Sequence, residues 1–203
     1  MGKKKIPRHW TRSPKIASEL VAGKFLPFKN PLNEDFNPVP QERFEVSSVF
    51  DHAQENGMNI GLWIDLTMAN DRYDADDVRR RGCRYYKLPL NGGRQVPQGC
   101  IDSFIRVCSK YIETNPDGVI GVHCTHGLNR TGFMIISYMV MVDNWAVTEA
   151  IGEFARIRPP GIRRKNYIHD LCDRFNGGIL VDIPEESDVS SAKTAKTIKI
   201  KQS

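Results

Sequence analysis

The middle of the chain alternates between two patterns of hydrophobic positions. Short continuous apolar runs, which are typical of buried strands, lie at 60–66, 84–90 and 119–123. Apolar residues at helical spacing predict helices at 101–114, 131–142, 147–157 and 166–175. Strands that alternate with helices favour an α/β fold, with a central, mostly parallel sheet flanked by helices.

The two ends of the chain lack this alternation. Residues 1–41 are rich in proline and basic residues, and they include large apolar residues such as Trp10 and Phe28. Because such residues are normally buried, we expect an irregular arm that docks in part on the domain. Residues 42–178, joined by the arm from about residue 6, are the expected domain. Residues 179–203 are expected to form a polar, disordered tail.

Charge is concentrated at the beginning of the chain. The net charge is +5, but residues 1–29 hold eight Lys or Arg and one Glu, and the rest of the chain is slightly acidic. A cationic segment fits a polyanion such as RNA or a nuclear targeting role, with a solvated arm as the alternative. The sequence has no apolar run of 18 residues, so we expect no membrane span. Its five cysteines include no CxxC pair, which indicates free thiols in a reducing compartment.

The segment 119–132, VIGVHCTHGLNRTG, carries the candidate chemistry. A predicted strand ends at His123, and a short loop leads from Cys124 to Arg130 before the next helix. Backbone N–H groups of such a loop, together with the helix N-terminus, can surround a phosphate, and the planar fork of Arg130 can bind two of its oxygens. The loop residues between the cysteine and the arginine are Thr125, His126, Gly127, Leu128 and Asn129.

Within this loop the residue types fit a nucleophilic mechanism. The thiol of Cys124, near a helix N-terminus and an arginine, should have a pKa well below the ~8.5 of a free thiol, which makes it a nucleophile toward phosphorus. Thr131 can donate a hydrogen bond to the sulfur. His123 can fix the loop through its ring nitrogens, and His126 and Asn129 can brace the loop or contact substrate. Gly127 permits a positive φ or a close backbone approach.

This segment has three other interpretations. One is that the Cys-x5-Arg spacing arose by chance, since a buried cysteine is usually an unreactive core residue. Zinc binding by Cys124, His123 and His126 lacks a second ligand pair at finger-like spacing. A Walker loop is excluded because the chain has no GxxxxGK[ST] motif.

The sequence HCTHGLNRTG resembles the signature of cysteine-dependent, dual-specificity-like phosphatases, in the form found in their RNA 5′-triphosphatase branch. The resemblance also covers IPRHW, VAGKFLPFK, GLWIDLT, RYDADDV, RPPGIRR and NYIHDL, and therefore about residues 6–176. It implies the cysteine-phosphatase fold and metal-independent removal of terminal phosphate from 5′-triphosphorylated RNA through a cysteinyl-phosphate, without a cofactor. By motif match, Cys124 is the nucleophile, Arg130 the phosphate clamp and Thr131 the helper.

Two sub-branches of this family remain open. HGLNRTG, GRQVP and RKNYI resemble the stand-alone phosphatases that interact with RNA and ribonucleoprotein complexes, which implies a 5′-monophosphate product. RPPGI and VAGKFLPFK resemble the triphosphatase domain of mRNA capping enzymes, which stops at the diphosphate. We favour the stand-alone type. A dual-specificity protein phosphatase is the other alternative, and a non-catalytic module that binds RNA 5′ ends is disfavoured because nucleophile, clamp and helper are all present.

No aspartate or glutamate lies between Lys87 and Ile101, where protein-directed members of the superfamily usually carry a general acid. A tyrosine leaving group, with a pKa of ~10, needs that proton more than a phosphate leaving group, with a pKa of ~6. The absence therefore favours a phosphoanhydride substrate. Asp65, at the end of a predicted strand, is a candidate catalytic residue by resemblance, and a structural carboxylate is the preferred alternative.

A triphosphate needs more cations than Arg130. The candidates are Arg94, Arg158, Arg163, Arg164 and Lys165, and Arg164 and Asn166 are the first choices because RPPGIRRKN resembles a family loop that faces the active site. Lys29 and the arm are expected to follow the RNA backbone through salt-sensitive contacts. The expected partners are triphosphorylated RNA and ribonucleoprotein or RNA-processing complexes. A monomer without membrane contact is the default, in the nucleus or cytoplasm, with the nucleus favoured.

Overall fold

The computed structural model describes residues 4–36, 38–93 and 95–175, and the strands in this part of the chain form one sheet. The strands lie in the order β1-β4-β2-β3, and every neighbouring pair is parallel. Their bounds are Phe25–Lys29 for β1, Ile60–Asp65 for β2, Arg84–Lys87 for β3 and Val119–Cys124 for β4. The predicted α/β fold with a mostly parallel sheet is confirmed.

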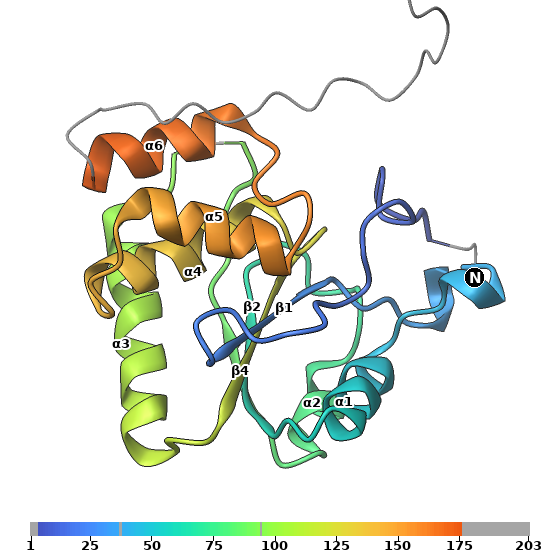
Figure 1. Ribbon diagram of the computed structural model, residues 1–203. Helices are drawn as coiled ribbons and strands as arrows, with labels where there is room; N and C mark the ends of the chain where they lie inside the picture. Colours follow the sequence, from blue (N-terminus) through green and yellow to red (C-terminus); the bar gives the residue numbers. More distant parts are fainter. Residues whose placement is uncertain (1–3, 37, 94, 176–203) are drawn as a thin grey trace, which may run out of the picture.

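Helices cover both faces of the sheet (Figure 1). One side carries α1 (Val46–Glu55) and α2 (Ala75–Arg79), preceded by the short 3-10 helices Glu34–Phe36 and Pro40–Glu42. The other side carries α3 (Gln98–Thr114), α4 (Asn129–Met141), α5 (Val147–Ile157) and α6 (Lys165–Phe175). Helix α4 is buried along most of its length and contacts α3, α5, α6 and β4. It is therefore the central helix of its layer, as its apolar sequence predicted.

Strand β1 lies inside the segment 1–41 that the sequence predicted to be irregular. All of its residues, FLPFK, are buried, and it pairs with β4 at the edge of the sheet. An edge strand tolerates Pro27, which has no N–H to donate. The proline and the terminal lysine obscured the strand in the sequence, although Trp10 and Phe28 are buried as expected. The predicted tail, 179–203, lies outside the described residues.

The predicted helices are present, with small differences at their ends. Helix α5 has the predicted bounds, whereas α3 begins three residues earlier than predicted and α6 one residue earlier. Helix α4 begins two residues earlier, so its first turn includes the end of the Cys124–Arg130 loop. Helix α1 was not predicted. Helix α2 begins at a capping residue, because the Asp74 side chain accepts a hydrogen bond from the Asp76 N–H. None of the described helices is long and apolar enough to span a membrane.

Candidate active site

The phosphate loop, Cys124–Arg130, connects the carboxyl end of β4 to the first turn of α4. Gly127 has a φ of +66°, a left-handed conformation that glycine adopts readily. A side-chain carbon at this position would also collide with the backbone carbonyl of Phe28 in β1. The loop therefore packs directly on β1, and both the turn and the contact require glycine.

Cys124 lies at the base of this loop and is 2% exposed. Burial alone raises the pKa of its thiol. The charge of Arg130, the Thr131 hydroxyl and the backbone N–H groups of Thr131 and His126 outweigh it and lower the pKa below the ordinary value. The Thr131 hydroxyl is buried and has no other hydrogen-bond partner among the described residues. The site therefore favours a thiolate, which is the nucleophilic form of cysteine.

The guanidinium of Arg130 is held in place by three acceptors. Nη1 donates to the carbonyls of Leu66 (3.2 Å) and Leu90 (2.9 Å), and Nη2 donates to the Thr125 hydroxyl (2.9 Å). These bonds leave the Nε–H and one Nη2–H, which form a bidentate fork, for an anion in the loop. The arginine is oriented before substrate arrives, so binding an anion costs little side-chain entropy.

We expect iodoacetate to inactivate the protein near neutral pH by alkylating Cys124. Because its pKa is lowered, alkylation should extend to lower pH than that of an ordinary thiol and decline as the pH falls through the lowered pKa. By contrast, burial raises the pKa of Cys83 to about 12 and that of Cys108 well above the ordinary thiol value. Mass spectrometry of labelled peptides across a pH series measures this. Inorganic phosphate should protect Cys124, and labelling that starts only above about pH 8.5 would contradict a lowered pKa.

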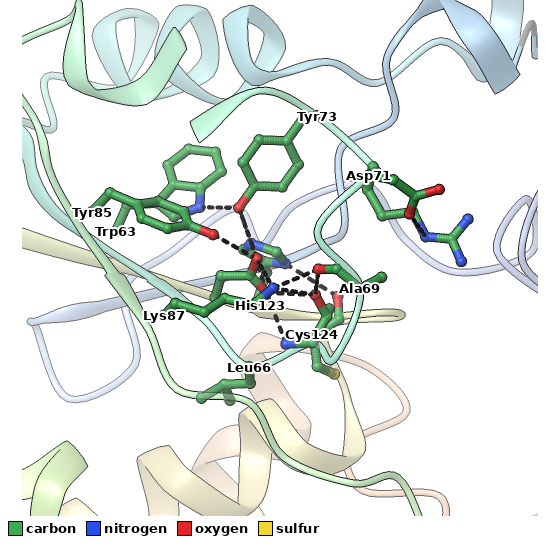
Figure 2. A network of polar contacts seen from close by, with 12 residues as sticks. Trp63, Leu66, Ala69, Asp71, Tyr73, Tyr85, Lys87, His123 and Cys124 are labelled. Atoms are coloured by element: carbon green, nitrogen blue, oxygen red, sulfur yellow. Dashed lines mark hydrogen bonds and ion pairs between the residues drawn. The ribbon is translucent and has the colours of Figure 1, made fainter. Parts of the chain in front are cut away.

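Behind the loop, His123 is fully buried and belongs to a chain of hydrogen bonds (Figure 2). Trp63 Nε1 donates to the Tyr73 hydroxyl at 2.8 Å, and that hydroxyl lies 2.7 Å from His123 Nε2. His123 Nδ1 lies 3.3 Å from the Cys124 carbonyl, which can only accept. The proton is therefore on Nδ1, and Nε2 accepts from Tyr73. Burial lowers the pKa of His123, so the ring stays neutral and fixes the direction of the Cys124 carbonyl.

Asp65 is buried and its carboxylate is already occupied. One oxygen accepts from the Thr67 N–H and hydroxyl, both at 2.7 Å, and the other from the Tyr85 hydroxyl (2.9 Å) and Lys87 Nζ (2.8 Å). Burial raises its pKa, but the hydrogen bonds from the Lys87 ammonium and from Thr67 lower it. The carboxylate therefore stays ionised and serves as an acceptor.

Sequence reasoning missed Tyr73, Tyr85 and Lys87, which complete this network. The strand register pairs Asp65 with His123 on one side and with Lys87 on the other. All three lie at the carboxyl ends of parallel strands, where polar side chains of neighbouring strands meet. In the sequence, the polar residue at the end of each strand could have indicated this cluster. Only the strand register, which the structure provides, shows that these residues are neighbours.

Other loop residues brace the loop against neighbouring segments. His126 Nε2 lies 2.8 Å from the carbonyl of Arg8, so it carries a hydrogen and donates it. The Asn129 side-chain oxygen accepts from the backbone N–H groups of Arg163 (2.8 Å) and Arg164 (3.0 Å). Leu128 is buried at the N-cap of α4. The loop is thus tied to the N-terminal segment on one side and to the segment before α6 on the other.

The structure brings one further arginine to the site. A methyl group on Gly93 would lie 2.9 Å from Arg164 Nη1, and one on Gly92 would lie 3.8 Å from Arg130 Cζ. Two consecutive glycines therefore adjoin both guanidinium groups, which places Arg164 next to the phosphate loop. Arg163 is exposed on the same segment, and Asn166 is exposed in the first turn of α6. Arg94 lies outside the described residues.

Two predicted substrate cations are instead buried. Arg158 is 1% exposed and donates to the carbonyls of Gly127, His126 and Pro14. Lys29 is fully buried, with its ammonium 3.6 Å from the centre of the Trp10 ring. Burial lowers the pKa of Lys29 to about 8. The prediction that Lys29 follows an RNA backbone is wrong, because this lysine points into the domain.

The zinc alternative rested on Cys124, His123 and His126. The Nε2 atoms of the two histidines already take part in hydrogen bonds. His123 Nε2 accepts from the Tyr73 hydroxyl, and His126 Nε2 donates to the Arg8 carbonyl. Across residues 4–36, 38–93 and 95–175, no group of three or more His, Cys, Asp or Glu side chains is placed to hold a metal ion. The described geometry favours an anion in this loop over a metal.

Comparison with known proteins agrees with this geometry. The chain is 39% identical over 175 residues to an mRNA-capping enzyme of Caenorhabditis elegans, a match that covers 84% of this chain and 28% of that protein. It is 36% identical over 178 residues to an RNA/RNP complex-1-interacting phosphatase of Rattus norvegicus, covering 85% of this chain and 54% of that protein. The chain thus spans less than a third of the first relative and about half of the second.

Solved structures share the fold of this chain. A crystal structure of Tk-PTP matches with a TM-score of 0.62 at 15% identity, covering 80% of this chain and 97% of that one. The family described as "Dual specificity phosphatase, catalytic domain" matches residues 45–176, which include the whole phosphate loop. The chain therefore belongs to the dual specificity phosphatase family of cysteine phosphatases.

Proposed function

We propose that the protein is an RNA 5′-polyphosphatase that removes terminal phosphates from triphosphorylated RNA. The observation that carries the proposal is the proximity of Arg164 to Arg130 across Gly92 and Gly93. One arginine can clamp the transferred phosphate while the other neutralises the next phosphate in the chain. The names of the relatives, an mRNA-capping enzyme and an RNA/RNP complex-1-interacting phosphatase, support the same substrate class.

The reaction follows in two balanced steps. The Cys124 thiolate attacks the terminal phosphorus, an S–P bond forms, and the bond from phosphorus to the bridging oxygen breaks. The RNA leaves with the bridging oxygen as part of its new terminal phosphate. Water then attacks the cysteinyl-phosphate, the S–P bond breaks, and the water proton passes to solvent as phosphate departs. Arg130 and the loop N–H groups stabilise the transferring group, and the Thr131 hydroxyl stabilises the departing thiolate.

In this mechanism Asp65 is a positioning residue. Its carboxylate is buried and ionised, and it holds Lys87, Tyr85 and Thr67. The leaving phosphate, with a pKa of ~6, departs without a dedicated proton donor. A tyrosine leaving group, with a pKa of ~10, depends more on a proton donor.

The arm supplies a route for the rest of the RNA. The Arg8 carbonyl is bonded to His126 in the phosphate loop, and the side chains of Arg8 and Arg12 are exposed. Phosphates beyond the 5′ end can contact these cations through sequence-independent, salt-sensitive interactions. We also infer ribonucleoprotein or RNA-processing partners, a monomer, and an intracellular location with the nucleus favoured.

The product that we propose is the 5′-monophosphate, formed by two successive rounds. The diphosphate end presents the same chemistry as the triphosphate, since a phosphoanhydride is again next to a leaving phosphate. A capping-type enzyme that stops at the diphosphate is the alternative, supported by the identity to mRNA-capping enzymes.

Substrate competition tests the assignment. With triphosphorylated RNA and a phosphotyrosine peptide in one reaction without added metal, we expect kcat/KM to favour the RNA by at least about 100-fold. Equal or greater hydrolysis of the peptide would assign the chain to protein dephosphorylation instead.

Replacing Arg164 by glutamine is expected to weaken action on triphosphorylated RNA selectively. The variant should lose about tenfold in kcat/KM on this RNA, because one charge-assisted contact is lost, and should keep its activity on p-nitrophenyl phosphate. Steady-state kinetics on both substrates measure the split. Arg106→Gln, on the exposed face of α3, is the matched control. An equal loss on both substrates would show that Arg164 does not bind the second phosphate.

A further inference from the structure

The dual specificity phosphatase match begins at residue 45, yet the phosphate loop is bonded to residues that precede it. His126 donates to the Arg8 carbonyl at 2.8 Å. The Asn30 N–H donates to the Thr125 carbonyl at 3.2 Å. The loop is therefore supported by the matched domain on one side and by the N-terminal segment, residues 8–30, on the other.

Arg158 connects these two sides. Its Nε donates to the Gly127 carbonyl at 3.1 Å, and its Nη2 donates to the carbonyls of His126 (3.2 Å) and Pro14 (2.7 Å). A single guanidinium thus holds two carbonyls of the loop and one of the N-terminal segment. When the carbonyls of His126 and Gly127 point toward Arg158, the N–H groups of the same peptide planes are fixed in the opposite direction.

The charge of Arg158 is unusual for its position. The residue is 1% exposed, and no carboxylate forms an ion pair with it in the part of the chain that the structure describes. Burial lowers its pKa to about 10, and the negative charge of Cys124 acts in the opposite direction. A buried cation is costly unless polar groups compensate it. The three carbonyls and the Cys124 thiolate offset part of this cost, and Arg158 Nη1 has no hydrogen-bond partner among the described residues.

The N-terminal segment is itself firmly held. Trp10 Nε1 donates to the Asn30 carbonyl at 2.7 Å, and the Lys29 ammonium donates to the Trp10 carbonyl at 3.2 Å while lying over the Trp10 ring. The Lys29 N–H donates to the Lys15 carbonyl at 2.9 Å. The segment to which Arg158 donates is therefore held by several contacts, and Arg158 links it to the loop carbonyls.

We propose that residues 8–30 are a working part of the active site and that Arg158 is the positioning residue that couples them to the phosphate loop. Arg158 sets the direction of the loop N–H groups and, with its charge, supports the Cys124 thiolate. It acts through the loop and does not contact substrate. The proposal concerns the phosphate loop and holds whatever the natural substrate is.

Two substitutions separate the geometry from the charge. Arg158→Lys keeps a cation but cannot bond three carbonyls at once, and Arg158→Met removes both properties. We expect Arg158→Lys to raise KM for p-nitrophenyl phosphate and the inhibition constant of vanadate by about tenfold. We expect Arg158→Met to add a rise of about one pH unit in the apparent pKa of Cys124 alkylation. Arg156→Met, an exposed arginine paired with Glu153, is the matched control.

The alkylation profile is informative because the groups around Cys124 are known. They are Arg130 from α4, Arg158 from the end of α5, His123 from β4 and His126 from the loop. His123 stays neutral because burial lowers its pKa, so a shift in the Cys124 profile reports the arginines and the loop N–H groups. A purely structural role for Arg158 would reduce thermal stability without moving this profile.

Hydrogen exchange of the wild-type protein provides a second test that does not depend on a variant. Vanadate bound in the phosphate loop should slow amide exchange within residues 8–30, because coupling between two sites is reciprocal. Unchanged exchange in this segment would overturn the coupling. Kinetics, vanadate inhibition and alkylation within twofold of Arg156→Met in both Arg158 variants would overturn the role of Arg158.

Discussion

Replacing Cys124 by serine is expected to lower kcat by at least about 10⁴-fold, because a serine hydroxyl at this position does not ionise near neutral pH. The site lowers the pKa of a thiol through Arg130, Thr131 and two backbone N–H groups. The same groups cannot bring an alcohol into the titration range. Release of inorganic phosphate from triphosphorylated RNA measures the loss.

The fold should survive this substitution, since serine is slightly smaller than cysteine and the buried sulfur already accepts hydrogen bonds. Thermal unfolding should therefore be close to that of wild type. Cys100→Ser, on the half-buried thiol of α3, is the matched control and should retain full activity. Substantial turnover by the Cys124 variant would mean that the reaction does not pass through a cysteinyl-phosphate.

Replacing Arg130 by lysine is expected to lower kcat/KM by about 10³-fold, although the charge is kept. The guanidinium bonds to Leu66, Leu90 and Thr125 while presenting a two-hydrogen fork to the anion. A lysine ammonium cannot satisfy these acceptors and also bind two phosphate oxygens. Steady-state kinetics on triphosphorylated RNA measure the effect, with Arg106→Lys as control. A loss below about tenfold would show that charge alone is sufficient.

The strand–loop–helix arrangement around Cys124 and Arg130 was the part of the candidate site that could be predicted most directly from the sequence. Its chemistry depends on backbone N–H groups and on three nearby side chains, Cys124, Arg130 and Thr131, and all of these lie within eight consecutive residues. Their roles follow from local spacing between a strand and a helix. The central helix α4 was equally readable because it is apolar on all sides.

Residues that depend on tertiary contacts were less predictable. Lys29 and Arg158 carry charges that a sequence pattern assigns to the surface, yet Trp10 covers the first and backbone carbonyls surround the second. Strand β1 was missed for a similar reason, since Pro27 and Lys29 obscure its apolar character. The groups that stabilise the two buried charges lie far from them in the sequence.

The most direct test of the proposed function is a time course on short 5′-triphosphorylated RNA that separates tri-, di- and monophosphate ends. The reaction contains no added metal, and Cys124→Ser is run in parallel. We expect diphosphate ends to appear transiently and monophosphate ends to accumulate in the wild-type reaction alone. Accumulation that stops at the diphosphate would support the capping-type alternative. Triphosphate ends that stay intact while a phosphotyrosine peptide is hydrolysed would rule out the proposed RNA 5′-polyphosphatase activity.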